Sequence, residues 1–196
     1  MRKLIILICF IQTLSTEAYS KSTILFLGDG MGITTITAAR IYEGQVKGID
    51  GESHSLSFES FENVAFVKTY SADAQIPDSA GTMSAIMTGQ KTRSGVISVG
   101  PKYKRGDCES VLLDSRTTLL ELAEKAGLKT GIITTARITD ATPAATYAHA
   151  SDRTWENDEK IPQESKEKGC TDIAQQLIGF PFGDGIDLAF GGGRSN

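Results

Sequence analysis

Hydrophobic positions along the chain follow two patterns, short continuous runs and runs with the spacing of a helix. Four short runs predict buried strands, at residues 23–27, 63–69, 129–135 and 186–190. Four other segments predict helices, at residues 33–42, 79–88, 119–126 and 173–178. Glycines follow the last three of these segments, where a helix commonly ends. The polar, glycine-bearing stretch at 44–60 predicts a loop, and so does the connection that leads to about residue 110.

The order of strand, helix and strand predicts an α/β fold, with a largely parallel sheet and helices on both faces. In such sheets, ligands bind just beyond the carboxyl ends of the strands. Asp29, Ser79 and Asp140 fall near strand ends or at the starts of the helices that follow. These three residues are therefore the first candidates for a functional site.

Composition places the chain among ordinary globular proteins that are long enough for one core. Of its 196 residues, 40% are hydrophobic and 22% charged, and 20 are glycine. The net charge is −4, so the chain offers no strongly basic surface to a nucleic acid. The sequence gives no indication of nucleic-acid specificity.

Residues 1–20 have the pattern of a secretory signal peptide. Two basic residues precede an apolar run at 4–14, which is too short to cross a bilayer. Small residues, Ala18 and Ser20, occupy the two positions that a signal peptidase requires. An N-terminal membrane anchor is the alternative. The signal predicts export to the periplasm or the extracellular space, with 21–196 as the exported part.

Two cysteines, Cys108 and Cys170, remain after the predicted signal peptide is removed. A pair of cysteines in an exported chain predicts a disulfide, because the compartment is oxidising. Such a bridge would stabilise the fold by about 4 kcal/mol on a chain-entropy estimate. Two free thiols are the alternative.

Asp78 and Ser79 stand at the start of the helix predicted for residues 79–88. A helix N-terminus offers free backbone N–H groups and the positive end of the helix dipole, so anions bind there readily. A hydroxyl at this point is well placed to attack a phosphoryl or acyl group. The simpler alternative is that one of the two residues only caps the helix.

The glycine-rich segment at 28–32 invites comparison with a dinucleotide-binding loop. That loop requires a glycine where this chain has Ile33, and a carboxylate inside it would repel a pyrophosphate. The preferred interpretation is that the glycines allow a tight turn and present Asp29 as an oxygen ligand for a cation. A turn with an exposed aspartate remains the alternative.

A second group of polar residues lies between 138 and 153. Asp140 and Thr142 are two positions apart, so their side chains share a face if the segment is extended. A carboxylate and a hydroxyl suit Mg²⁺ better than Zn²⁺, although Pro143 also fits a simple turn that opens a helix. Arg153 could clamp a phosphate with its planar guanidinium, or it could be an ordinary surface arginine.

Three motifs in order, LFLGDGMG, PDSAGTMSAIMTG and DATPAATYAHASDR, resemble the alkaline phosphatase family. The resemblance covers essentially all of the chain after the signal peptide and ends at FGGGR. It implies an alkaline-phosphatase-like α/β fold and hydrolysis of phosphomonoesters through a phosphoserine. It further implies two zinc ions, one magnesium ion and a homodimer. In animal members the positions of Cys108 and Cys170 form a disulfide.

The resemblance also assigns roles to single residues. Ser79 would be the nucleophile, coordinated by a zinc ion, and Asp29 would lie between a zinc ion and the magnesium. Asp140 and Thr142 would belong to the magnesium side, and members of the family carry Asp or His at the position of Asp140. Arg153 would hold the phosphate oxygens, with Asp78 helping to orient it.

The remaining metal ligands of the family lie further along the chain than residue 196. Neither His54 nor His149 falls at a ligand position, and zinc strongly favours histidine and cysteine. We therefore expect residues 21–196 to be the N-terminal portion of an alkaline phosphatase catalytic domain, with incomplete zinc sites. We expect His149 to pack or hydrogen-bond near Arg153.

Two functional hypotheses follow from this resemblance. The chain is either part of a secreted, metal-dependent alkaline phosphatase, or a truncated non-catalytic product that binds at most Mg²⁺ or phosphate weakly. A phosphodiesterase or sulfatase of the same superfamily is a further alternative, although the sequence motif of a sulfatase is absent.

Overall fold

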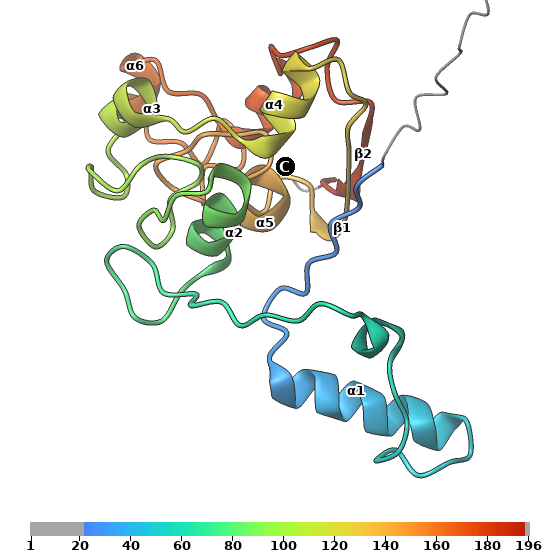
Figure 1. Ribbon diagram of the computed structural model, residues 1–196. Helices are drawn as coiled ribbons and strands as arrows, with labels where there is room; N and C mark the ends of the chain where they lie inside the picture. The colour runs from blue at the N-terminus through green and yellow to red at the C-terminus, as the bar shows by residue number, and fades with distance from the viewer. Residues whose placement is uncertain (1–21, 195–196) are drawn as a thin grey trace, which may run out of the picture.

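The computed structural model describes residues 22–194, and the predicted signal peptide lies outside this range. The elements are α1 (Ile33–Val46), the 3₁₀ turn η1 (Ser57–Ser60), α2 (Ser79–Thr88), α3 (Glu109–Asp114), α4 (Leu119–Lys125), β1 (Gly131–Arg137), α5 (Ala141–Ala144), α6 (Gln163–Glu167), α7 (Ile173–Ile178) and β2 (Leu188–Gly192). Figure 1 shows α1 and η1 set apart from the other elements and joined to them by extended segments. Each predicted helix is present, and α1 runs into the stretch predicted as loop.

The two described strands form a parallel pair, as the sequence predicts for this part of the chain. Ile132 lies opposite Ala189 and Ile133 opposite Phe190, and the register shifts before Arg137 meets Gly192. The chain between the strands carries α5, α6 and α7, so the connection is a helical crossover. This arrangement is the α/β architecture expected from the sequence.

The main core lies where α2, α4 and α5 meet the inner face of β1. Three side chains of α2 are buried there, at the positions predicted from helical spacing: Ala80, Met83 and Met87. Small residues of the segment after α5 allow close packing, and Ile132 and Ile173 complete the cluster. The sheet and α2 are therefore fixed to each other through α5, which begins at a candidate site residue.

A smaller core surrounds the disulfide between Cys108 and Cys170. Their Cα atoms are 6.0 Å apart and 62 positions apart in sequence. Trp155 and Ile161 are buried in the same cluster as the two cysteines. The bridge, which agrees with the pairing predicted from the sequence, ties α3 to the segment between α6 and α7.

The buried face of α4 differs from the one that the apolar spacing predicts. Leu119 and Leu122 are 56% and 54% exposed, whereas Leu120 and two glutamates are buried. Glu121 forms a capping box with Thr118, and its other oxygen lies 2.6 Å from Nε2 of His149. Glu121 turns inward to a polar partner 28 positions away, and Glu124 accepts a hydrogen bond from the hydroxyl of Thr130; the spacing within one helix cannot reveal either contact.

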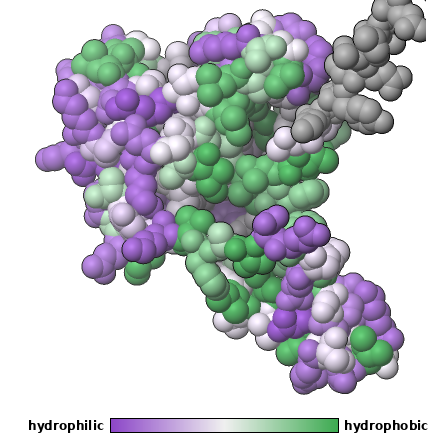
Figure 2. Space-filling model, in the orientation of Figure 1, coloured by the Kyte–Doolittle hydropathy of each residue, from purple (hydrophilic) through white to green (hydrophobic). Residues whose placement is uncertain are grey.

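Residues 23–27 and 63–69, predicted as strands, are not strands in the structure. Both run as irregular chain, and their large side chains are exposed, with Phe26 at 87% and Phe66 at 93%. A strand needs a neighbour to pair its backbone groups, and within residues 22–194 neither segment has one. Figure 2 shows hydrophobic surface gathered on the side of the molecule where these segments pass the sheet.

Candidate active site

The start of α2 places Asp78 and Ser79 in different roles. Asp78 is the N-cap, and its Oδ1 accepts a hydrogen bond of 3.0 Å from the amide of Gly81. Its Oδ2 accepts from the amide of Gly95, also at 3.0 Å. Because Asp78 supplies the cap, the Ser79 hydroxyl is left at the helix N-terminus, 3.5 Å from Nη1 of Arg153.

Arg153 lies between two carboxylates that belong to different helix starts. Its Nη1 donates to Oδ2 of Asp78 and its Nη2 to Oδ1 of Asp140, both at 3.1 Å. The side chain is 27% exposed. The contacts show that Arg153 is held in place beside Ser79, in contrast to an ordinary surface arginine.

Asp140 caps α5 as well as facing Arg153. Its Oδ1 accepts from the amide of Ala141 at 2.7 Å, so β1 leads directly into the capped helix. Arg137, at the end of β1, lies 3.6 Å from Asp140 and makes two hydrogen bonds, of 2.7 and 2.9 Å, to Glu156. Sequence reasoning missed Arg137 and Glu156, whose contact becomes visible only in the fold.

Asp29 and Thr142 meet although they are 113 positions apart in sequence. The hydroxyl of Thr142 donates to Oδ2 of Asp29 at 2.8 Å. Asp29 precedes Gly30, whose positive φ of 66° gives the tight turn expected of this loop. This contact brings the glycine-rich loop to α5, next to the helix start that carries Asp140.

The electrostatic balance at this site keeps Asp78 ionised. Partial burial acts to raise the pKa of Asp78, but the hydrogen bonds from Gly81, Gly95 and Arg153 outweigh it. The pKa of Asp78 is therefore held below its ordinary value, and the carboxylate stays charged opposite the guanidinium.

Oxygen donors of this site match magnesium and not zinc. Asp29, Asp140 and Thr142 offer two carboxylates and a hydroxyl, which are ligands of a hard cation. Within residues 22–194, no three His, Cys, Asp or Glu side chains cluster closely enough to hold a metal. The described residues therefore supply oxygen donors of the kind that Mg²⁺ prefers, and they include no cluster with the nitrogen and sulfur ligands typical of zinc.

His149 takes no part in this site. Its Nδ1 lies 2.9 Å from the carbonyl oxygen of Ser98 and its Nε2 2.6 Å from Glu121. The ring thus links the segment before Arg153 to α4. This position agrees with the hydrogen-bonding role predicted for His149 and not with metal ligation.

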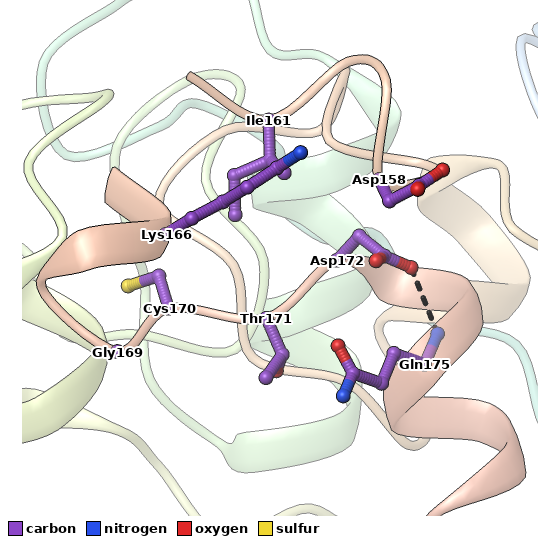
Figure 3. Close-up of a pocket in the computed structure, with 8 residues that line it drawn as sticks. All are labelled: Asp158, Ile161, Lys166, Gly169, Cys170, Thr171, Asp172 and Gln175. Carbon is purple, nitrogen blue, oxygen red and sulfur yellow. Dashed lines mark hydrogen bonds between the residues drawn. The ribbon is translucent and has the colours of Figure 1, made fainter. Parts of the chain in front are cut away.

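A cavity lies away from Ser79, beside the disulfide. It measures about 310 Å³ and lies between α6 and α7. Figure 3 shows Asp172, which caps α7 by accepting a 2.8 Å hydrogen bond from the amide of Gln175. Of the predicted site residues, only Cys170 lines this cavity.

Comparison with known proteins decides the family. A model of the alkaline phosphatase family matches residues 20–196. The chain belongs to the alkaline phosphatase family. It is 44% identical over 184 residues to the human tissue-nonspecific isozyme and 44% identical over 188 residues to alkaline phosphatase 4 of Drosophila melanogaster. Each alignment covers 94% of this chain, but only 34% and 31% of the relative, so the chain spans about a third of their length.

Solved structures of alkaline phosphatases show the same fold. The enzyme from the Antarctic bacterium TAB5 is 29% identical, with a TM-score of 0.51 over 64% of this chain and 31% of its own. A histidine-to-aspartate mutant of that enzyme, with Mg bound in its M3 site, matches 72% of this chain and 33% of its own, with a TM-score of 0.53. The two-stranded parallel sheet and its helices are thus part of the alkaline phosphatase fold.

Proposed function

We propose that the protein hydrolyses phosphomonoesters through a phosphoserine formed at Ser79. One observation carries the proposal: Nη1 of Arg153 lies 3.5 Å from the Ser79 hydroxyl at the N-terminus of α2. A phosphate at that point would meet both a planar cation and the free amides of a helix start. Membership of the alkaline phosphatase family supports this reading.

In the proposed reaction, Oγ of Ser79 attacks phosphorus in line, and the bond to the alcohol oxygen breaks. Water then displaces the serine from phosphorus, which releases inorganic phosphate and restores the hydroxyl. Arg153 binds the equatorial oxygens in both steps, where negative charge is spread in the transition state. Asp78 and Asp140 orient Arg153, because each accepts one of its N–H groups at 3.1 Å.

Magnesium is the metal that these residues fit. Asp29, Asp140 and Thr142 would hold it, and a bound Mg²⁺ would supply positive charge beside the phosphate. The structural neighbour with an aspartate in place of a histidine and Mg in its M3 site supports this choice. The resemblance also implies two zinc ions, but the described residues do not complete a zinc site, so no step is assigned to zinc.

The test uses a chimera that joins residues 22–196 to the part of the human isozyme beyond the matched region. We expect it to hydrolyse p-nitrophenyl phosphate, and acid quenching to trap labelled phosphate on Ser79. Ser79→Ala should lower activity by at least about 1,000-fold, because the nucleophile is lost. Ser57→Ala, which removes an exposed hydroxyl in η1, is the control and should change neither result.

A folded chimera that cleaves phosphodiesters or sulfate esters in preference to monoesters would contradict the proposal. So would full activity in the Ser79→Ala variant. The second candidate is a non-catalytic product. That product would bind at most Mg²⁺ or phosphate weakly.

We further propose that residues 1–20 direct export and that the protein acts outside the cytoplasm as a homodimer. The disulfide supports an oxidising compartment. One relative is a membrane-bound alkaline phosphatase of Bombyx mori. Among residues 22–194, no helix is long and apolar enough to cross a membrane.

A further inference from the structure

We infer that the ion pair of Arg105 with Asp152, acting through the backbone of Gly95, positions Arg153 beside Ser79. The importance of this positioning for catalysis rests on the proposed function, whereas the contacts that position Arg153 do not depend on it. Neither member of the pair hydrogen-bonds to Ser79, so both are positioning residues.

Gly95 connects both sides of the site through its backbone. Its N–H donates to Oδ2 of Asp78 at 3.0 Å, and its carbonyl accepts from the amide of Arg153 at 2.8 Å. The backbone of one residue, Gly95, thus binds both the carboxylate of Asp78 and the main-chain amide of Arg153. The φ of Gly95 is 78°, a conformation that other residues rarely adopt.

Arg105 covers Gly95 and leaves no space there for a side chain. A Cβ atom on Gly95 would collide with the guanidinium of Arg105. The same guanidinium makes two hydrogen bonds to Asp152, of 2.9 and 2.8 Å, in the bidentate geometry that fixes orientation as well as distance. Arg105 therefore lies against Gly95, and Asp152 fixes the orientation of its guanidinium there.

Asp152 fixes the backbone on the C-terminal side of Arg153. Besides Arg105, it accepts from the amide and the hydroxyl of Thr154, at 2.9 and 2.8 Å. The amide of Gly106 donates to the carbonyl of Ser151 at 2.8 Å, so the loop that carries Arg105 is attached just before Asp152 as well. Hydrogen bonds therefore hold the backbone just before Arg153, at Arg153 itself and just after it.

Charge supports the same role for the pair. Burial acts to raise the pKa of Asp152, but Arg105 and Thr154 hold it below the ordinary value. The hydrogen bond to Asp152 likewise raises the pKa of Arg105. Because a misplacement of about 1 Å can cost about 100-fold in rate, a device that fixes Arg153 would matter to phosphate binding.

The test measures amide hydrogen exchange of the full chain by mass spectrometry, in the cold and at low protein concentration. Asp152→Asn and Arg105→Gln each remove the ion pair while keeping a side chain of similar shape. We expect exchange at Gly95 and Arg153 to become up to about fivefold faster in both variants, the upper end of the effect of losing an exposed pair. Exchange at Ile132 in β1 should not change.

A second measurement follows the side chain of Arg153 directly, through its modification by phenylglyoxal. Its rate relative to Arg137 should rise in both variants, because the hydrogen bonds of Arg137 to Glu156 are untouched. Asp184→Asn is the matched control. It removes a 2.7 Å ion pair with Lys129, and neither residue of that pair bonds to Gly95, Arg105 or Arg153. That control should leave both Arg153 readouts as they are.

Unchanged exchange at Gly95 and Arg153 in both variants would overturn the inference. Equally faster exchange along the whole chain would also overturn it, since that result indicates general destabilisation. Neither hydrogen exchange nor phenylglyoxal modification depends on catalysis. An inactive chimera would therefore contradict the proposed function without affecting the conclusion about the position of Arg153.

Discussion

At the residue scale, Asp78 is both a helix cap and a partner of Arg153, two roles that the sequence presents as alternatives. Its Oδ1 caps α2, and its Oδ2 accepts from Gly95 and Arg153. A cap and an active-site role are compatible because a carboxylate has two oxygens with separate lone pairs. The capping geometry turns Oδ2 toward Arg153 and leaves Ser79 free.

The ion pair of Asp152 predicts a dependence of stability on pH. The pKa of Asp152 is lowered from 3.8, so its stabilising contribution is present above that pH and is lost as the pH falls through the lower folded-state value. Asp152→Asn should therefore reduce the free energy of unfolding by about 1 kcal/mol near neutral pH. The two proteins should converge in acid, as measured by urea unfolding at several pH values.

A difference between the two proteins that grows toward acid would contradict this assignment. Glu164→Gln is a suitable control, because it removes an exposed ion pair between Glu164 in α6 and Lys168, the residue that follows α6. Exposed pairs of this type contribute little to stability, so the control should behave like the unchanged chain.

Some residues of the candidate site were beyond sequence reasoning. Arg105 and Asp152 are 47 positions apart; Asp152 lies in the third family motif, but Arg105 lies outside the motifs, and nothing in the sequence pairs the two. Gly95 resembles any loop glycine until its φ and its two backbone partners are known. Their roles arise from contacts between distant segments, which no local pattern encodes.

At the element scale, helices with strong end signals were predictable. The apolar positions of α2, its cap at Asp78 and the left-handed Gly89 all agree with the sequence pattern. These features act within one or two turns of helix, so neighbours in sequence are sufficient to define them. In α4 the ends were equally clear, but the buried face was not.

The burial pattern of α4 gives a direct prediction. Leu120→Ala should lower the free energy of unfolding by about 2 kcal/mol or more, because it leaves a cavity in the core. Leu122→Ala should cost less than about 0.5 kcal/mol, since that side chain is 54% exposed in this chain. Urea unfolding of the two variants provides the comparison, and a larger loss from Leu122→Ala would refute the burial of Leu120.

At the scale of the whole molecule, the chain exposes an unusual amount of apolar surface. Ile24, Val64 and Ile133 are between 72% and 81% exposed, and the two-stranded sheet has free edges. Exposed apolar patches and unpaired edges promote association. This surface belongs to a chain that spans 34% of its human relative.

We predict that the isolated chain aggregates or has a low melting temperature, below about 55 °C. Differential scanning calorimetry with light scattering checks this expectation. A sharp, cooperative transition above about 55 °C, within the usual range of mesophilic domains, would contradict it.

We also predict that the isolated chain does not measurably hydrolyse p-nitrophenyl phosphate, even with zinc and magnesium added. The reason is that its described residues hold no cluster of three metal-binding side chains. A colorimetric assay on the purified chain is sufficient. Activity that disappears in Ser79→Ala would show that the site is complete without further residues.

The sequence by itself determined the family motifs, the helices with their caps and glycine ends, and the parallel order of the last two strands. These depend on neighbours along the chain. Only the tertiary structure decided that residues 23–27 and 63–69 remain unpaired, and that Arg153 stands between Asp78 and Asp140. The physical reason is that strand pairing and charge contacts join segments far apart in sequence, and their geometry is fixed by packing.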